Sequence, residues 1–351
     1  MHIQDMLTRS VQQGVSDLHL SAGLPAMWRI DGSLHAVDSQ LLTHEAIASA
    51  VDDIMPLHHR EHFAQTLEAD FSLEVRGVSR FRVNAFHQIR GMSVAFRVIP
   101  RHVPSLTDLE APSVFTDCVL RPRGLVLVTG STGAGKSTTL AAMIQELNTT
   151  QSKHVLTIED PVEFLFTPER CLINQREVGG QTLSFANALR AALREDPNVI
   201  LVGEMRDLET IRLAITAAET GHLVLATLHT SGAAKAIDRI IDVFPAEEKS
   251  VVRSMLSESL TAVISQALCK RQGGPGRVAA YEILVATAAV RNLIREGKIA
   301  QLYSSMQTGS NVGMQTLDQA LARLVQQGVI SQDEAATQAR YPENFGARSH
   351  T

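Results

Sequence analysis

The most informative stretch of the sequence is a glycine-rich segment that ends in lysine and serine, at residues 130–137. It matches the pattern G-x-x-x-x-G-K-[ST] in full and lies between an apolar run, 124–129, and a stretch of helical character that begins at Thr138. Backbone N–H groups of such a loop converge on phosphate oxygens, and the following helix adds partial positive charge at its N-terminus. The pattern predicts a phosphate cradle made of Gly130, Ser131, Thr132, Gly133, Ala134, Gly135, Lys136, Ser137 and Thr138.

Two side chains of this segment have separate chemical tasks. The Lys136 ammonium supplies a point charge between the β and γ phosphates, and the Ser137 hydroxyl is an oxygen ligand for Mg²⁺. Because apolar run, loop and helical stretch follow one another in the required order, an incidental glycine-rich turn explains the segment poorly. The segment predicts a site for a nucleoside triphosphate with Mg²⁺.

A phosphoryl-transfer site of this kind also needs carboxylates that hold magnesium and orient water. Two acids follow apolar, strand-like runs: Glu204, directly after 199–203, and Glu163, in the segment 157–163. Gly203 stands where many P-loop proteins carry the aspartate that orders Mg²⁺, so Glu204 needs help from other groups. For Glu163 alone, a functional role and a solvated surface position are equally compatible with the sequence.

The residues before about 100 combine helical and strand patterns, as in a small α+β unit. Apolar residues between 3 and 11 recur at helical spacing, and Gly14 marks the end of that helix. Two strand-like runs are joined by Asp31-Gly32, a turn signal of β-hairpins. The pattern continues with a helical stretch at 43–66 and strands at 81–85 and 94–98. Prolines then indicate a linker, so the first domain with its linker is expected to span 1–104.

The rest of the chain has a different pattern, in which short apolar runs alternate with helical stretches. Strands buried on both faces are typical of parallel sheets, so this part is expected to be an α/β domain over 105–351. Its last part, about 289–340, is expected to be helical, with Ser331 and Glu334 forming a capping box. The apolar runs lie at 124–129, 155–158, 199–202 and 223–228.

Composition excludes several other classes of protein. The chain has 351 residues, 44% of them hydrophobic and 20% charged, which is typical of a folded globular protein. A formal net charge of -5 argues against a dedicated nucleic-acid binder. The three cysteines form no CxxC pair, and neither a membrane-spanning apolar run nor a signal-peptide core is present in the sequence. We therefore expect a protein of the reducing cytoplasm.

Taken in order, four boxes resemble those of the secretion and type IV pilus ATPases. They are the glycine-rich segment, the box at 157–163, the box at 202–207 and the histidine-containing box at 220–230. The segment 289–296, Ala-Val-Arg-Asn-Leu-Ile-Arg-Glu, is similar to an element of the retraction branch, the PilT-type twitching-motility ATPases. Residues 16–20 and 80–84 are similar to that branch too. Assembly and secretion relatives usually add a four-cysteine zinc module, which three cysteines cannot form.

The resemblance implies a fold, a ligand and an assembly. The first domain is similar to a PAS-like module and the second to a RecA-like core, and members assemble as hexameric rings that hold ATP where neighbouring subunits meet. Glu204 corresponds to the Walker B glutamate and Glu163 to the Asp-box glutamate. One of them orients or deprotonates the attacking water and the other helps Ser137 hold Mg²⁺, in an order that the sequence leaves open. His222 and His229 match histidines that lie near the nucleotide.

Arginines are concentrated between residues 79 and 101, where no acid occurs. They fit a solvated basic strand face, but the resemblance implies that some reach the γ-phosphate, where an arginine is worth roughly 10³–10⁵ in rate. Arg82 and Arg97 are the expected ones, and Arg239, after the histidine box, is a further candidate. The absence of interleaved exposed aromatics argues against a nucleic-acid surface.

The resemblance therefore implies a hexameric Mg²⁺-ATP-hydrolysing motor that powers pilus retraction. Its partner would be the inner-membrane pilus platform protein, with membrane contact only through that partner and with no nucleic acid bound. Three alternatives stay open: the accessory paralogous retraction ATPase, a regulatory subunit that binds ATP but hardly hydrolyses it, and a RecA-like nucleic-acid translocase. For the retraction motor, we expect segment 289–296 to couple hydrolysis to retraction, so that loss of its arginines abolishes retraction but leaves the ring and basal hydrolysis largely intact.

Overall fold

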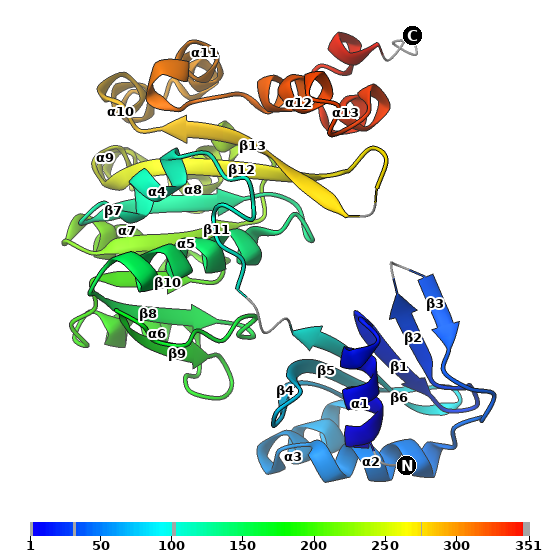
Figure 1. The fold of residues 1–351 in the computed structure, drawn as a ribbon. Coiled ribbons are helices and arrows are strands. Elements are labelled where there is room, and N and C mark those ends of the chain that lie inside the picture. Colours follow the sequence, from blue (N-terminus) through cyan, green and yellow to red (C-terminus); the bar gives the residue numbers. More distant parts are fainter. Residues whose placement is uncertain (1–2, 31–32, 100–102, 275, 347–351) are drawn as a thin grey trace. The chain divides into compact units, whose positions relative to one another are not determined.

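The computed structural model describes residues 3–30, 33–99, 103–274 and 276–346 and divides into two compact units (Figure 1). The first contains the described residues up to 99 together with the short segment Glu163–Leu165. The second contains Val103–Val162 and the described chain from Phe166 onward. The expected turn at Asp31-Gly32 and the arginine at 101 lie outside the described residues.

The first unit is an antiparallel sheet of six strands with three helices, and its strand order is β3-β2-β1-β6-β5-β4. Along β5, Phe81, Val83 and Ala85 are buried and alternate with less buried residues, so one face of the sheet contributes to the core. The elements are α1 (Ile3–Gln12), β1 (Asp17–Ser21), β2 (Met27–Ile30), β3 (Ser33–Ala36), α2 (His44–Ile54), α3 (Leu57–Thr66), β4 (Glu68–Val75), β5 (Ser79–Gln88) and β6 (Gly91–Ile99).

One helical stretch of the sequence is divided in two. The expected helix over 43–66 is interrupted at Met55, which is extended with ψ 124°, and Pro56 then precedes α3. Proline disfavours the helical conformation in the residue before it, which explains the break. The N-terminus of α2 is capped by Thr43, whose hydroxyl accepts a hydrogen bond from the Ala46 N–H at 3.2 Å.

The second unit is built on a sheet of seven strands in the order β13-β12-β7-β11-β10-β8-β9. All neighbours are parallel except the pair β12 and β13, so the predicted parallel sheet is confirmed. Every residue of β7, β10 and β11 is buried, as expected for strands covered on both faces. The strands are β7 (Gly124–Thr129), β8 (His154–Glu159), β9 (Leu172–Glu177), β10 (Val199–Val202), β11 (Leu223–Leu228), β12 (Leu260–Lys270) and β13 (Arg277–Val285).

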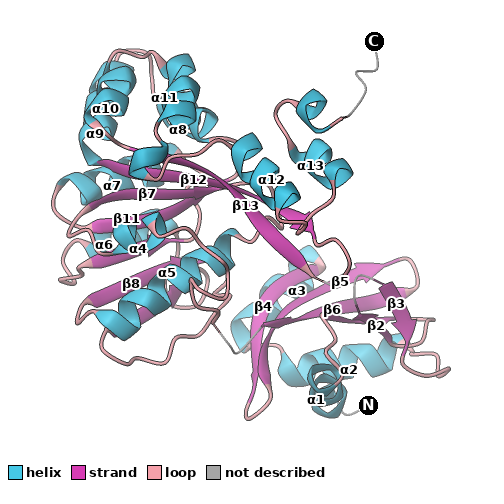
Figure 2. Cartoon of the chain, turned by 45° about the horizontal axis from the view of Figure 1, so that its top comes forward, coloured by secondary structure: helices cyan, strands magenta, loops and turns pink. Residues whose placement is uncertain are grey.

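Helices cover both faces of this sheet (Figure 2). Alternate residues of β7 separate the two cores: Leu125 and Leu127 belong to the cluster that includes α6 to α9, whereas Val126 and Val128 belong to the cluster with α4 and α5. The helices are α4 (Val114–Val119), α5 (Lys136–Thr150), α6 (Phe185–Ala192), α7 (Leu208–Glu219), α8 (Ala233–Asp242) and α9 (Lys249–Ser259).

The last part of the chain is helical and packs on the β12 and β13 end of the sheet. A third apolar cluster of this unit joins Cys269, Val278 and Ala280 of these strands to residues of α12 and α13. The Ser331 hydroxyl caps α13 as predicted, but the Glu334 carboxylate accepts from Lys270 N at 2.9 Å instead of closing a capping box. The elements are α10 (Ala288–Arg295), η1 (Ile299–Gln301), α11 (Leu302–Thr308), η2 (Ser310–Val312), α12 (Leu317–Gln326), α13 (Gln332–Gln338) and η3 (Pro342–Phe345).

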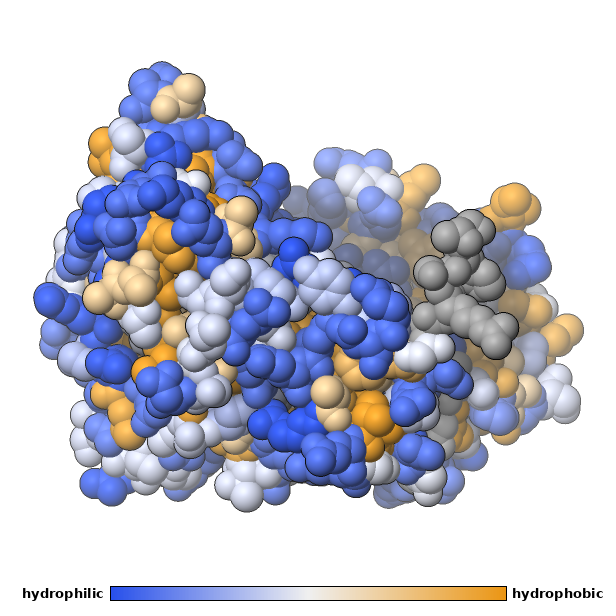
Figure 3. Space-filling model, turned by 90° about the horizontal axis from the view of Figure 1, so that it is seen from above, coloured by the Kyte–Doolittle hydropathy of each residue, from blue (hydrophilic) through white to orange (hydrophobic). Residues whose placement is uncertain are grey.

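One face of the molecule is drawn in Figure 3 by the hydropathy of its residues. On the face drawn in Figure 3, hydrophilic side chains predominate and apolar ones occur in small separate groups. Among the described helices, none is both long enough and apolar enough to cross a bilayer.

Candidate active site

The glycine-rich segment forms a loop between β7 and α5, at the carboxyl end of a central strand of the sheet. Gly130, Gly133 and Gly135 have φ values of 148°, 78° and 86°, which favour glycine. The helix α5 then begins at Lys136, so its first-turn N–H groups point toward the loop. Carboxyl ends of parallel strands are where open α/β sheets bind ligands, and the loop adds N–H donors for an anion there.

Lys136 is held at this loop by backbone carbonyls. Lys136 is buried, with only 8% of its surface exposed, and its Nζ donates to the carbonyl oxygens of Gly130 at 2.9 Å and Ser131 at 3.0 Å. A buried ammonium needs such partners, because desolvation of an unpaired charge is costly. The structure therefore keeps a positive charge next to the loop, in the position that the sequence predicts.

His229 connects this lysine to the predicted Walker B glutamate. Its Nδ1 lies 3.4 Å from Lys136 Nζ, and its Nε2 lies 3.1 Å from Glu204 Oε1. An ammonium can only donate, so Nδ1 is the acceptor and the neutral ring carries its proton on Nε2, from which it donates to the carboxylate. The three side chains thus form a continuous chain of polar contacts.

Arg206 completes the arrangement on the other side of Glu204, with Nη2 2.7 Å from Oε2. Partial burial of Glu204 raises the pKa of its carboxyl, but the hydrogen bond and charge of Arg206 and the hydrogen bond from His229 outweigh that effect, so the pKa lies below its ordinary value. The same contact raises the pKa of Arg206. Glu204 is therefore an ionised acceptor near neutral pH.

Steric crowding explains why the residue before Glu204 is a glycine. Gly203 N donates to Ile158 O at 2.8 Å, and a Cβ at Gly203 would lie 3.1 Å from that oxygen and 3.2 Å from Glu159 Cα. The neighbouring strand β8 therefore leaves little room for a side chain at Gly203. Met205 N donates to Thr227 O at 3.1 Å, which ties the residues on both sides of Glu204 to the adjacent strands.

Gln266 is a residue of the site that the sequence analysis missed. It lies in β12, buried, where its Oε1 accepts from Thr139 Oγ1 at 2.9 Å and its Nε2 donates to Ala134 O. The main-chain carbonyl oxygen of Gln266 also lies 2.5 Å from the place where a Cβ of Gly130 would stand. Gln266 therefore braces the loop and the first turn of α5, and no local motif signals this because it is 127 residues from Thr139.

Within the described chain, His222 does not lie beside the glycine-rich loop. His222 precedes β11, and its carbonyl accepts from the N–H of Gly124 at the start of β7. The loop begins at the other end of β7, after six strand residues that rise about 3.3 Å each. The His222 ring instead lies 3.0 Å from the carbonyl of Ala217, at the end of α7.

The remaining predicted side chains are not brought to the loop by contacts within the described chain. In the first unit, Arg97 Nε lies 2.8 Å from Asp17 Oδ1, and Arg82 Nε lies 3.8 Å from Asp70 Oδ1. Glu163 is exposed, in the segment grouped with that unit, and Arg239 is exposed on α8. Their proposed roles at a nucleotide therefore remain predictions.

The residues around the loop fit a magnesium ion that arrives with a nucleotide. Ser137, in the first turn of α5, has a hydroxyl without a hydrogen bond in the described structure. The described chain holds no cluster of three or more His, Cys, Asp or Glu that could bind a metal by itself. Mg²⁺ commonly uses one or two protein oxygens plus phosphates and waters, so this donor set suits it. Buried hydroxyls of Thr129 and Thr230, next to the loop and to His229, also lack partners among the described residues.

Comparison with known proteins places these features in one family. The family described as "Type II/IV secretion system protein" matches residues 1–337. A type IV pilus retraction ATPase, PilT, from Pseudomonas aeruginosa is 59% identical over 345 residues, covering 98% of this chain and 100% of the relative. A twitching motility protein from Neisseria gonorrhoeae is 58% identical, covering 91% of this chain and 85% of the relative.

Solved structures agree with the sequence comparison. A crystal structure of the pilus retraction motor PilT with bound ADP has a TM-score of 0.91 and 46% identity, and the match covers 98% of each chain. The ATPase DotB from Legionella pneumophila has a TM-score of 0.81 and 29% identity, covering 98% of this chain and 95% of that one. The mixed α/β fold with its sheet-based ATPase domain is therefore shared with these proteins.

Proposed function

This chain belongs to the family of type II/IV secretion system proteins and is a PilT-like ATPase, and from that premise we propose that it is the motor of type IV pilus retraction. In this proposal a homohexamer hydrolyses Mg²⁺-ATP and uses the energy to depolymerise pilin during twitching motility. The observation that carries it is the contact chain Lys136–His229–Glu204 beside the glycine-rich loop, in a sequence similar to PilT over its full length.

The chemistry assigned to these residues is positioning and charge stabilisation. The loop N–H groups and Lys136 neutralise charge on the β and γ phosphates, which is the main requirement of a loose phosphoryl-transfer transition state. Mg²⁺, held by Ser137 together with Glu204 or Glu163, would supply further positive charge at those phosphates. Because Glu204 is ionised, it can orient an attacking water and accept its proton. Glu163 is the alternative for that task.

The assembly supplies the parts that one chain does not bring together. We assign the first domain, residues 1–104, to a PAS-like module and residues 105–351 to a RecA-like ATPase domain with a helical end. In the ring, Arg82 and Arg97 would leave the acids that hold them and reach the γ-phosphate, with Arg239 as a further candidate. Hinge closure between domains is a common way to convert ligand state into displacement.

The proposed partner is the inner-membrane platform protein of the pilus, and the proposed location is the cytoplasmic side of that membrane. An accessory retraction ATPase is a further proposed partner. The accessory role itself is less well supported, since the chain is 59% identical to PilT of P. aeruginosa but 40% identical to PilU of the same organism. No nucleic acid is part of the proposal, in keeping with the net charge of -5.

Steady-state hydrolysis of Mg²⁺-ATP by the purified chain and its Glu204→Gln variant tests the enzymatic part. We expect hydrolysis by the wild type and its loss in the variant, with ATP binding kept in both. Binding without hydrolysis by the wild type would favour the regulatory-subunit alternative.

A complementation experiment tests the motor role. The chain would be expressed in P. aeruginosa that lacks its own PilT, where we expect the wild type to restore twitching and Glu204→Gln not to restore it. An active ATPase that restores no twitching would contradict retraction.

A further inference from the structure

A cavity lies at the edge of the sheet opposite the glycine-rich loop. Its volume is about 960 Å³, within the range of ligand-binding clefts. It is lined by the start of β7 at Gly124, the start of β12 at Thr261 and the end of β13 at Val285. Since β7 runs from this cavity to the loop, the cavity is separate from the nucleotide site. The proposed hydrolysis gives it no role.

Three arginines contribute to the wall of this cavity, and the guanidinium groups of two of them have no polar partner in the described chain. Arg291 Nη1 donates to the carbonyls of Ser257 and Glu258, at 2.5 and 2.6 Å. Arg121 and Arg123 are exposed, and their guanidinium groups make no ion pair or hydrogen bond within the described part of the chain. Several other arginines of this unit do have acidic partners: Arg176 with Glu195, Arg212 with Glu248, and Arg271 with Glu110.

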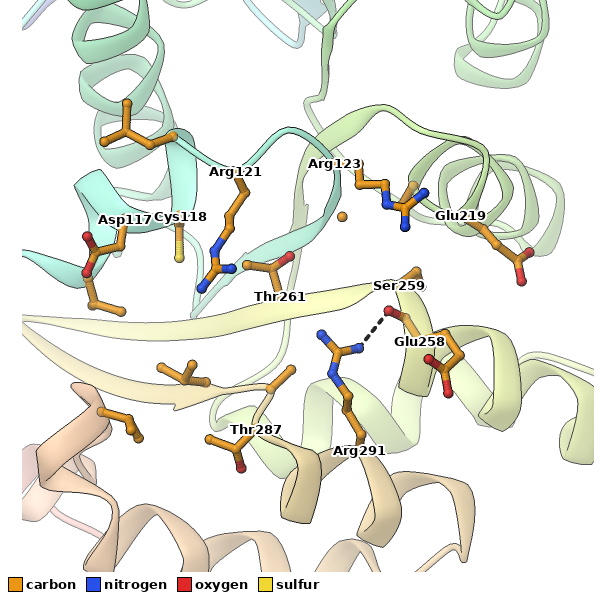
Figure 4. A pocket seen from close by; sticks show the side chains of 17 residues that line it. Asp117, Cys118, Arg121, Arg123, Glu219, Glu258, Ser259, Thr261, Thr287 and Arg291 are labelled. Atoms are coloured by element: carbon orange, nitrogen blue, oxygen red, sulfur yellow. Dashed lines mark hydrogen bonds between the residues drawn. The ribbon is translucent and has the colours of Figure 1, made fainter.

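The arrangement of charges makes the middle of the cavity positive. Figure 4 shows Arg121 and Arg291 pointing into the cavity from opposite walls. The lining carboxylates lie at the margin and point away from the middle in the same view, and the one on Glu258 is paired with Arg295. These marginal acids are Asp117, Glu219 and Glu258. An anionic group that enters the cavity would therefore meet guanidinium groups first.

Helix ends distinguish among the anions that the cavity could take. Helices α4, α7 and α9 all end beside it, at Val119, Glu219 and Ser259. Their C-termini present carbonyl oxygens and partial negative charge, which disfavours a compact, multiply charged phosphate. A carbonyl oxygen has two lone pairs, so the carbonyls at the end of α9, which accept from Arg291, keep one for an N–H group of a peptide. Guanidinium groups beside carbonyl oxygens complement a peptide that carries carboxylate side chains.

Arg121 and Arg123 are two positions apart in the sequence, and the residue between them restricts the backbone. Pro122 separates Arg121 from Arg123, and proline both fixes its own φ and favours an extended conformation in the residue before it. Two cationic residues at i and i+2 are thereby pre-organised, which lowers the entropy cost of binding. In an extended peptide, side chains at i and i+2 lie on one face, about 6.6 Å apart. We propose that the cavity binds an extended acidic segment of a partner protein, whose alternate carboxylates pair with Arg121 and Arg123.

The proposal is independent of the retraction role, and a binding measurement tests it directly. A fluorescently labelled peptide, Glu-Gly-Glu-Gly-Glu, would be titrated with the full chain saturated with Mg²⁺-ADP, so that the glycine-rich loop is filled. We expect saturable binding at low salt that weakens as salt rises. The double variant Arg121→Glu/Arg123→Glu should lower the affinity by about tenfold or more, since it places like charges opposite one another.

Matched controls separate this site from general electrostatic attraction. The variant Arg170→Glu/Arg194→Glu changes the net charge equally at two exposed arginines outside the cavity and should bind within about twofold of the wild type. The peptide Gln-Gly-Gln-Gly-Gln should not bind. If the charge-reversed protein fails to fold, as judged by its unfolding midpoint, Arg121→Gln/Arg123→Gln takes its place.

Equal binding by the cavity variant and the wild type would overturn the proposal, and so would equal binding of the glutamine peptide. Pyrophosphate is the competitor that tests the phosphate alternative. If pyrophosphate displaces the peptide at equal or lower concentration, with the loop still filled by ADP, the cavity is a phosphate site and the peptide assignment is wrong.

Discussion

His229 Nε2 lies 3.1 Å from Glu204 Oε1 while the other nitrogen of the same ring faces Lys136 Nζ. One imidazole therefore links the lysine of the phosphate loop to the carboxylate assigned to water. Glu204 and His229 lie at the ends of different strands, since Glu204 follows β10 and His229 follows β11. The parallel pairing of β10 with β11 is what places them together.

Replacing His229 by alanine should slow hydrolysis by at least about tenfold and leave ADP affinity nearly unchanged, because the lost contact orients Glu204 and not the phosphates. The measurement is steady-state hydrolysis together with ADP binding. His222→Ala is the matched control, since that ring lies against the Ala217 carbonyl near the end of α7, and its hydrolysis rate should match the wild type. Equal loss in both variants would contradict the assignment.

Arg206 should set the acid limb of the pH dependence of hydrolysis. Its hydrogen bond helps hold the pKa of Glu204 below the ordinary value, so Arg206→Ala should raise that pKa and move the acid limb to higher pH. Because a lowered folded-state pKa stabilises the protein above the unfolded pKa, the same variant should lose stability near neutral pH and little at strongly acid pH.

The pH–rate profile and urea unfolding at several pH values measure both effects. Arg206→Lys keeps a positive charge and should fall between the wild type and Arg206→Ala. An acid limb that is the same in all three proteins would show that Glu204 does not control it.

Gln266→Leu should weaken nucleotide binding and destabilise the second unit. The leucine leaves the Thr139 hydroxyl and the Ala134 carbonyl without their partner, at a cost of about 1–3 kcal/mol for each buried group. Thermal unfolding and ADP titration measure the two effects. Gln266→Glu is the informative companion, because it keeps an acceptor for Thr139 but sets a carboxylate oxygen against the Ala134 carbonyl. If both variants bind ADP like the wild type, Gln266 does not brace the loop.

Arg291 and Arg295 should differ, although both belong to segment 289–296. Arg291 donates to two carbonyls at the end of α9, so Arg291→Ala should destabilise the second unit by about 1–3 kcal/mol. Arg295 is half exposed and pairs with an exposed Glu258, so Arg295→Ala should have little effect on stability. Urea unfolding of both variants decides. The two variants test separately, for each arginine, the prediction that its loss leaves the ring intact.

Local sequence was sufficient for the features that depend on contiguous residues. The apolar runs that became β7, β8, β10 and β11 could be recognised because a strand buried on both faces needs uninterrupted apolar residues. The pattern did not predict β4, β9, β12 or β13. Leu172–Glu177 is mostly polar, and β4 lies in a half-exposed sheet. Pro56 separates α2 from α3, a break that the apolar spacing over 43–66 does not indicate.

The phosphate loop could be recognised from local sequence, because its glycines, lysine and serine all belong to one short segment. Tertiary structure alone decided which distant side chains meet that segment. His222 and His229 flank the same strand, yet only His229 reaches the loop, because a parallel strand has its two ends on opposite edges of the sheet. Gln266 and the arginine-lined cavity follow from the same cause. Their partners are set by strand pairing and helix ends, which leave no local mark on the sequence.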